Sequence, residues 1–310
     1  MGFVTVFGAS GRQGLAQVRK LVKAGKHVRA ISRRADPFYG ERFSNTEVVA
    51  ADLDDEPSLA RAVDGAEAVF FTRPLIQTSD PIERIRRVGR VSKAAGVKRI
   101  VFNPSLWVPE APIGQATYDI AVKMETAFAE SGVPLTVFRA VLFMDNLLTN
   151  WARPHIVNEG RYVYPHRKSL AANWICLDDV AKFMIASLDR PDLEGARITI
   201  GGPEALVPEE VAQILSETLG RPVRYTPCTP EAFAGNLVKA FGDAFPAAMR
   251  GPTEARIAEF YHFNNGEAFN PFAVDMAPVL KRIPIEMETM RDWAKRQDWE
   301  DRGAPRPPAG

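Results

Sequence analysis

The residues with the clearest chemistry are three glycines near the start of the chain, Gly8, Gly11 and Gly14, in the run Gly-Ala-Ser-Gly-Arg-Gln-Gly. The run follows a short apolar segment, residues 3–7, and opens a segment with helical apolar periodicity, residues 11–24. Glycines here allow a tight turn, close approach of backbone to a pyrophosphate and close helix packing, while the helix N-terminus supplies N–H donors. The run therefore predicts a dinucleotide site, against the alternative of a glycine-rich turn without a ligand.

Two arginines, Arg33 and Arg34, follow the second apolar segment, residues 28–32, and the first carboxylate after them is Asp36. An NAD-preferring domain has an acidic residue in this region, which binds the ribose 2′-hydroxyl, whereas basic residues accommodate a 2′-phosphate. Arg12 in the glycine loop offers a further guanidinium, and bidentate arginine pairing suits a phosphate dianion. The pattern predicts NADP(H); the alternative is that these are solvated surface arginines.

The elements that must position these groups are typical of a doubly wound α/β protein. Strand-length apolar runs alternate with helix-period segments, which predicts βαβ units and a parallel sheet. The predicted strands are residues 3–7, 28–32, 47–50, 68–72, 99–103 and 135–139. An open sheet of this kind binds its ligand at the carboxyl ends of its strands. Further cofactor contacts are therefore expected from Ser10, Gln13, Asp52, Leu53, Thr72, Arg73, Pro74 and Asn103.

For some of these residues, the part of the cofactor that they contact can be predicted. The backbone of Thr72, Arg73 and Pro74 is expected beside the cofactor ribose, and Asp52 with Leu53 at the adenine edge. Asp52 could equally begin the next helix.

The strict alternation ends after about residue 139, which predicts a smaller C-terminal α+β substrate lobe. We expect an NADP(H)-binding Rossmann domain over residues 1–150, a lobe interleaved with it over residues 151–300, and a disordered tail over residues 301–310. In the lobe, helices are predicted at residues 179–188, 208–219 and 285–297, and strands at residues 174–177 and 197–200.

Composition narrows the function classes. The 310 residues carry a formal net charge of +1, which gives no global field favouring nucleic acid or an anionic membrane. No apolar run is long enough to span a bilayer and no signal-peptide layout is present, so we expect a cytoplasmic protein. The two cysteines, Cys176 and Cys228, and the four scattered histidines show no metal-ligand spacing, so no metal is expected.

Several segments in order along the chain resemble the NmrA-like branch of the atypical short-chain dehydrogenases/reductases. Each motif is modest alone, but their order and spacing together are fairly specific. They are the glycine loop, Ala-Ile-Ser-Arg-Arg at 30–34, Glu125 with Ser-Gly-Val-Pro-Leu-Thr-Val-Phe-Arg at 131–139, Phe-Met-Asp-Asn-Leu at 143–147, Asp-Asp-Val-Ala at 178–181, Gly-Gly-Pro-Glu-Ala-Leu at 201–206 and Leu-Gly-Arg-Pro-Val at 219–223.

The resemblance implies a Rossmann sheet of order 3-2-1-4-5-6, NADP(H) across its carboxyl edge and a small-molecule substrate. Related reductases carry a Tyr or His four residues before a Lys, with the ring as general acid. Here Tyr118 and Lys123 are five apart, and Ala121 occupies the usual lysine position if Glu125 marks the same helix. Tyr118 and Lys123 stay catalytic candidates if the helix start is shifted, with surface helix residues as the alternative.

The resemblance also implies roles beyond the fifth and sixth strands. Ser105 would lie near the reacting carbonyl as proton donor or substrate anchor, or would simply form the turn beside Pro104. Phe143 and Asn146 resemble the segment that closes over the nicotinamide, so both are expected at the substrate and Phe143 also at the cofactor. Aromatic side chains, of Trp107, Trp151 and Tyr164, could line the pocket or belong to the core. Residues 261–265 could add a wall.

Two function classes follow. The first is an NADPH-dependent reductase of an apolar, aromatic or conjugated carbonyl, quinone or enone, in which the cofactor carries the hydride. The second is a non-catalytic NADP(H) sensor that controls a partner protein, as some relatives do. An epimerase or dehydratase needs a better-placed base, and DNA binding lacks a basic recognition element. A monomer and a homodimer are both compatible with the sequence.

Overall fold

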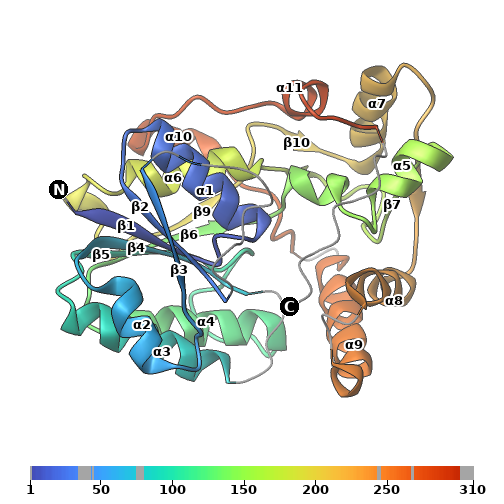
Figure 1. Cartoon of the computed structure of the whole chain (residues 1–310). Coiled ribbons are helices and arrows are strands. Elements are labelled where there is room, and N and C mark those ends of the chain that lie inside the picture. Colours follow the sequence, from blue (N-terminus) through green and yellow to red (C-terminus); the bar gives the residue numbers. More distant parts are fainter. Residues whose placement is uncertain are drawn as a thin grey trace.

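A parallel sheet of seven strands forms the centre of the molecule, with the order β3-β2-β1-β4-β5-β6-β9 (Figure 1). The computed structural model describes residues 2–33, 43, 45–74, 80–242, 246–266 and 269–300. The strands are β1 Phe3–Phe7, β2 Val28–Ser32, β3 Thr46–Ala50, β4 Ala66–Thr72, β5 Arg99–Asn103, β6 Leu135–Ala140 and β9 Arg197–Ile200. The predicted α/β class and the order of the first six strands are confirmed, and β9 extends the sheet beyond β6.

Helices cover both faces of this sheet. One face carries α1 (Arg12–Lys23), α6 (Leu177–Ala186) and α10 (Met276–Arg282), and the other carries α2 (Glu56–Val63), α3 (Pro81–Ala94) and α4 (Ala116–Glu130) (Figure 1). Each face has its own apolar core, one including Val18, Leu21 and Phe183 and the other including Phe71, Phe102 and Phe128. Burial on both faces explains why the inner strands are nearly continuous apolar runs.

Local sequence fixes where these helices begin. The carboxylate of Asp80 accepts from the N–H groups of Ile82 and Glu83 at the start of α3, and the side-chain oxygen of Gln115 accepts from Thr117 and Tyr118 at the start of α4. Such caps satisfy donors that the first helical turn leaves free. By contrast, α1 starts after Gly11 with no side-chain cap and no acidic residue in its first turn.

The remaining elements form a lobe at one end of the sheet (Figure 1). Its helices are η1 Met144–Leu148, α5 Arg153–Glu159, α7 Pro208–Leu219, α8 Pro230–Phe241, α9 Ala247–Asn264 and α11 Met290–Lys295, with η2 Pro191–Leu193 beside the sheet. Its short strands are β7 Arg161–Tyr164 paired with β11 Arg224–Pro227, and β8 Ala172–Asn173 paired with β10 Ala205–Leu206. A core of buried aromatic and aliphatic side chains joins them.

Three predicted lobe elements need correction. The strand predicted at 174–177 is wrong: β8 ends at Asn173, and Ile175 makes only an isolated bridge to Phe143. The α6 helix begins earlier than predicted because the Leu177 N–H is bonded to the Asp145 carboxylate. The helix predicted over 285–297 shortens to α11, whose start is capped by Thr289.

Segments from beyond residue 150 also complete the sheet half. Helix α6 packs on α1, α10 contacts β9, and β9 pairs with β6. We keep the division at residue 150, with an interleaved lobe up to residue 300, as a proposal. Arg34 and the tail 301–310 lie outside the described residues.

Candidate functional site

The glycine loop forms a tight turn between β1 and α1. Gly8 has a φ of +67°, and its carbonyl accepts a hydrogen bond of 2.9 Å from the Gly11 N–H. A Cβ on Gly14 would lie 2.3 Å from the Gly8 oxygen and 2.7 Å from the Ala9 Cα, so this position accepts no side chain. The uncapped start of α1 then points N–H donors and the positive dipole end at the space above the loop, an arrangement that binds phosphate.

A closed ring of hydrogen bonds ties this loop to the end of β5. The Asn103 amide donates to Gln13 Oε1 at 2.9 Å, and Gln13 Nε2 donates to Ser105 Oγ at 3.0 Å. The Asn103 Oδ1 accepts from the Ser105 N–H at 2.8 Å. Because Ser105 Oγ accepts within the ring, its own proton is free to be donated to a substrate oxygen.

Ser105 has an unusual backbone conformation. Its φ is +63°, in the left-handed region that residues other than glycine and asparagine rarely adopt. Such strain persists where surrounding contacts determine it and gathers at functional sites. The ring through Asn103 and Gln13 supplies those contacts.

The end of β4 lies beside this ring. Thr72 Oγ1 accepts a hydrogen bond of 2.9 Å from Gln17, a buried residue of α1, and the Arg73 N–H donates to the Asn103 carbonyl at 3.0 Å. Pro74 follows directly and is partly buried. Thr72, Arg73 and Asn103 therefore lie along one edge with the glycine loop, as the sequence predicts for the carboxyl ends of parallel strands.

The residues expected to bind the 2′-phosphate lie in two different regions. Ser10 and Ser32 approach each other at 3.3 Å between their hydroxyl oxygens, and Arg33 is exposed beside them at the end of β2. Arg12 instead donates to the Asp145 carbonyl, which follows β6 on the opposite side of β1. The part of Arg12 in binding the 2′-phosphate stays a prediction, and its guanidinium is engaged away from β2.

Asp52 and Leu53 form the turn before α2. The Asp52 carboxylate accepts from the Asp54 N–H at 2.9 Å, and the Asp52 N–H donates to Ser58. Asp52 is exposed at the end of β3 and Leu53 packs against the core of the α2 face. The carboxylate thus stabilises its own turn. Asp52 does not begin the next helix, because α2 starts at Glu56 after Asp55.

Tyr118 and Lys123 are not brought together. Tyr118 is fully buried and its hydroxyl donates to Asn264 of α9 at 2.7 Å, whereas Lys123 is exposed. Burial, only partly offset by the hydrogen bond with Asn264, raises the pKa of the Tyr118 phenol well above its usual value. The expectation that Tyr118 and Lys123 form a catalytic pair is therefore wrong. Tyr118 instead links α4 to α9. The five-residue spacing of Tyr118 and Lys123 was the sequence signal that the two are off register.

The predicted substrate residues divide into a rim and a core. Trp107 is partly buried, with its ring 4.6 Å from the exposed Phe269 and 5.3 Å from Tyr118. Phe143 directly precedes η1, and Asn146 lies within it. Trp151 packs edge-on to Phe233 at 5.1 Å in the lobe core. Trp107 therefore lies between the two halves, while Trp151 supports the lobe.

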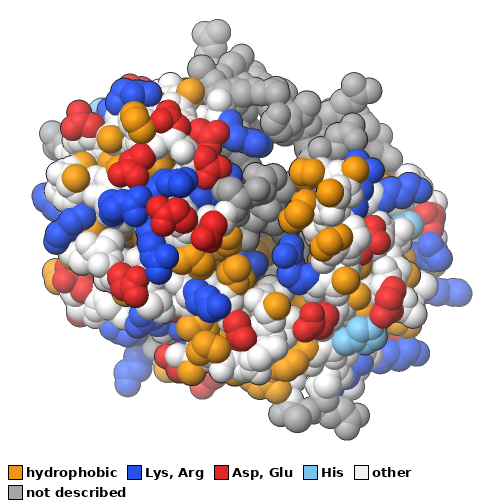
Figure 2. Space-filling model, turned by 90° about the horizontal axis from the view of Figure 1, so that it is seen from below, with side chains coloured by type: hydrophobic (Ala, Val, Ile, Leu, Met, Phe, Trp, Pro, Cys, Tyr) orange, Lys and Arg blue, Asp and Glu red, His pale blue; other side chains and the backbone are white. Residues whose placement is uncertain are grey.

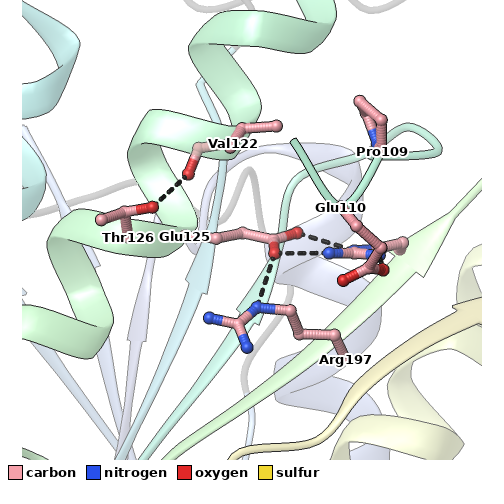
Figure 3. Close-up of a pocket in the computed structure, with 7 residues that line it drawn as sticks. Pro109, Glu110, Val122, Glu125, Thr126 and Arg197 are labelled. Carbon is pink, nitrogen blue, oxygen red and sulfur yellow. Dashed lines mark hydrogen bonds and ion pairs between the residues drawn. The ribbon is translucent and has the colours of Figure 1, made fainter. Parts of the chain in front are cut away.

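Tertiary structure adds residues that sequence reasoning missed. Arg256 comes from α9, and Asp145 holds both Arg12 and the start of α6. Asn264, in the segment 261–265 that the sequence suggested as a wall, bonds to Tyr118. A separate polar pocket of about 200 Å³ is lined by Pro109, Glu110, Val122, Glu125, Thr126, Arg139 and Arg197. None of the predicted site residues lines that pocket (Figure 3).

Comparison with known proteins decides the family. The profile of the NmrA-like family matches residues 2–298. The chain belongs to the NmrA-like family. It is 34% identical over 227 residues, 72% of this chain and 76% of its relative, to the (4-alkanoyl-5-oxo-2,5-dihydrofuran-3-yl)methyl phosphate reductase of Streptomyces griseus.

Solved structures show that this NmrA-like chain shares its fold with both enzymes and regulators. The Citrobacter sp. triphenylmethane reductase complexed with NADP(H) superposes with a TM-score of 0.73 at 20% identity, covering 94% of this chain and 99% of that one. NmrA, a negative transcriptional regulator in complex with NAD, superposes with a TM-score of 0.75 at 16% identity, covering 96% and 99%. Within the described residues, no helix combines the length and apolarity needed to cross a membrane.

Separate substitutions of Tyr118 and Ser105 test their roles. Tyr118→Phe is expected to cost about 1 kcal/mol of unfolding free energy, since it removes one buried hydrogen bond, while leaving turnover within roughly threefold. Ser105→Ala is expected to lower kcat about 100-fold, the usual contribution of a positioned proton donor. Urea unfolding and steady-state kinetics measure the two effects. A kcat loss in Tyr118→Phe as large as that in Ser105→Ala would contradict the assignment.

Proposed function

We propose that the chain is an NADPH-dependent reductase that acts on an apolar, aromatic or conjugated carbonyl, quinone or enone. The observation that carries the proposal is the ring of Asn103, Gln13 and Ser105, which joins a hydroxyl with a free proton to the glycine loop. A protein that only held a dinucleotide would need the loop but not a strained serine beside it. The named reductases among its relatives support the same class of activity.

Each part of the proposed mechanism falls to residues of this chain. The α1 N-terminus and the glycine loop bind the pyrophosphate, and Arg33 binds the 2′-phosphate. When bound, NADPH supplies the hydride. Ser105 donates a hydrogen bond or its proton to the substrate oxygen, oriented by Gln13. Trp107 and Phe269 supply an apolar wall that excludes water.

The proposed activity is tested by NADPH oxidation against a panel of quinones, enones and aromatic aldehydes, with NADH as a matched control. We expect turnover above background with at least one class and a preference for NADPH. Calorimetry of NADPH binding accompanies the assay. Tight NADPH binding without turnover across the panel would contradict the reductase and favour the sensor.

The rival function is a non-catalytic NADP(H) sensor. Two observations favour it: the buried Tyr118 is not paired with the exposed Lys123, and the fold resembles that of a negative transcriptional regulator in complex with NAD. A sensor requires different affinities for oxidised and reduced cofactor in its two states. Equal affinities for NADPH and NADP⁺, with turnover, would exclude it.

Selectivity between NADPH and NADH distinguishes the expected roles of Arg33 and Arg12. Arg33→Ala is expected to weaken NADPH binding about 10- to 100-fold and NADH binding little, because one charge-assisted contact to the 2′-phosphate is lost. Arg12→Ala is expected to change both affinities equally, since its guanidinium is held by Asp145. Titration calorimetry with both cofactors measures this. Equal losses for NADPH and NADH in Arg33→Ala would contradict the 2′-phosphate assignment.

A further inference from the structure

Arg73 and Arg256 come from opposite halves of the molecule, the sheet and the lobe. Arg73 follows β4 and is held by its N–H bond of 3.0 Å to the Asn103 carbonyl. Arg256 lies on α9, four and eight residues before Phe260 and Asn264, so the three share one helix face. Phe260 and Asn264 both contact Tyr118 of α4, which places this face toward the sheet half.

The two arginines differ in their exposure. Viewed from below, Figure 2 shows a hollow between the two halves, with Lys or Arg and hydrophobic side chains at its rim. Arg73 is only partly exposed, whereas Arg256 is exposed. Arg256 is therefore the more accessible of the two residues.

Neither guanidinium has an acidic partner among the described residues. No hydrogen bond or ion pair joins the side chain of Arg73 or Arg256 to a carboxylate in that part of the chain. By contrast, Arg84, Arg87 and Arg90 of α3 are paired with Asp54, Glu56 or Glu83. Burial, and then the like charge of Arg256, lower the pKa of Arg73 to about 10. A partly desolvated cation facing a second cation is unfavourable unless an anion binds between them.

We propose that Arg73 and Arg256 form a binding site for a phosphate or carboxylate group carried by the substrate. The inference rests on the proposed reductase function and deepens it, because Arg73 is bonded to the residue that orients Ser105. Two guanidinium groups offer several N–H donors at fixed angles, which suits the oxygens of such an anion. The substrate would thus combine a reducible conjugated or aromatic part near Ser105 with an anionic group toward α9.

Binding is measured directly, so the result does not depend on turnover. Phenyl phosphate and phenol are titrated by calorimetry into the protein saturated with NADPH. We expect phenyl phosphate to bind at least tenfold more tightly than phenol, and Arg73→Met and Arg256→Met each to lower its affinity about tenfold or more. The affinity of the Arg256→Met protein for NADPH should stay within about threefold. Arg256→Lys should retain part of the phenyl phosphate affinity because the charge remains.

Lys239→Met, an exposed cation of α8, is the matched control and should leave phenyl phosphate binding unchanged. If both arginine variants lose NADPH affinity, and phenyl phosphate binds only without NADPH, the anion belongs to the cofactor and the substrate assignment is overturned. Unchanged phenyl phosphate affinity in both arginine variants would overturn the site itself. Failure of the NADPH oxidation panel alone would contradict the reductase function without changing these binding results.

Discussion

Gly14→Ala is expected to abolish cofactor binding. The added Cβ would lie 2.3 Å from the Gly8 carbonyl oxygen and 2.7 Å from the Ala9 Cα, and both are backbone atoms that no side-chain rotation can move away. The α1 N-terminus must therefore shift from β1, which misplaces the N–H donors for the pyrophosphate. We expect NADPH and NADH affinities to fall roughly 100-fold or more, equivalent to about 2.8 kcal/mol, as measured by calorimetry.

Two glycine controls separate this effect from a general loss of stability. Gly235→Ala in α8 introduces a Cβ with no heavy atom within 4 Å, so both cofactor affinities should be unchanged. Gly11→Ala places its Cβ 3.2 Å from the Gly8 oxygen and should give an intermediate loss. Thermal unfolding without cofactor reports whether each variant folds. A folded Gly14→Ala protein with normal NADPH affinity would contradict the loop assignment.

Among substitutions that remove a charged side chain, Glu125→Ala is expected to lower the free energy of unfolding the most. Glu125 of α4 is 3% exposed, accepts two hydrogen bonds of 2.9 and 2.8 Å from Arg139 of β6, and a third of 3.0 Å from Arg197 of β9 (Figure 3). Its loss leaves the buried Arg139 cation with the exposed Glu110 as its one carboxylate partner among the described residues. Breaking such a buried pair costs about 3–5 kcal/mol, and urea unfolding measures it.

The matched control lies on the same helix. Glu130→Ala removes an exposed carboxylate whose ion pair with Arg86 spans 3.9 Å, and exposed pairs contribute about 0–1 kcal/mol. Glu125→Gln preserves the shape of the side chain and tests the charge alone. A loss below about 1 kcal/mol in Glu125→Ala would show that solvent or Glu110 compensates Arg139.

Much of the fold could be predicted because local patterns and burial agree. Strands β1, β2 and β5 have the predicted limits, and β3, β4 and β6 differ only by one or two residues at an end. Alternation of buried strands with amphipathic helices is compatible with few topologies. The lobe was harder, since β8 has two residues and α11 has six, too short for a periodic signal.

The sequence by itself determined the Rossmann fold, the glycine turn and the edge at which the cofactor site would lie, because these follow from local backbone preferences and from the direction of parallel strands. Only the tertiary structure decided the partners of the polar side chains. Arg12 turns to Asp145, and Tyr118 is buried against Asn264. Each pair joins elements more than a hundred residues apart, and the contact of two side chains depends on how helices pack in three dimensions, which no local pattern encodes.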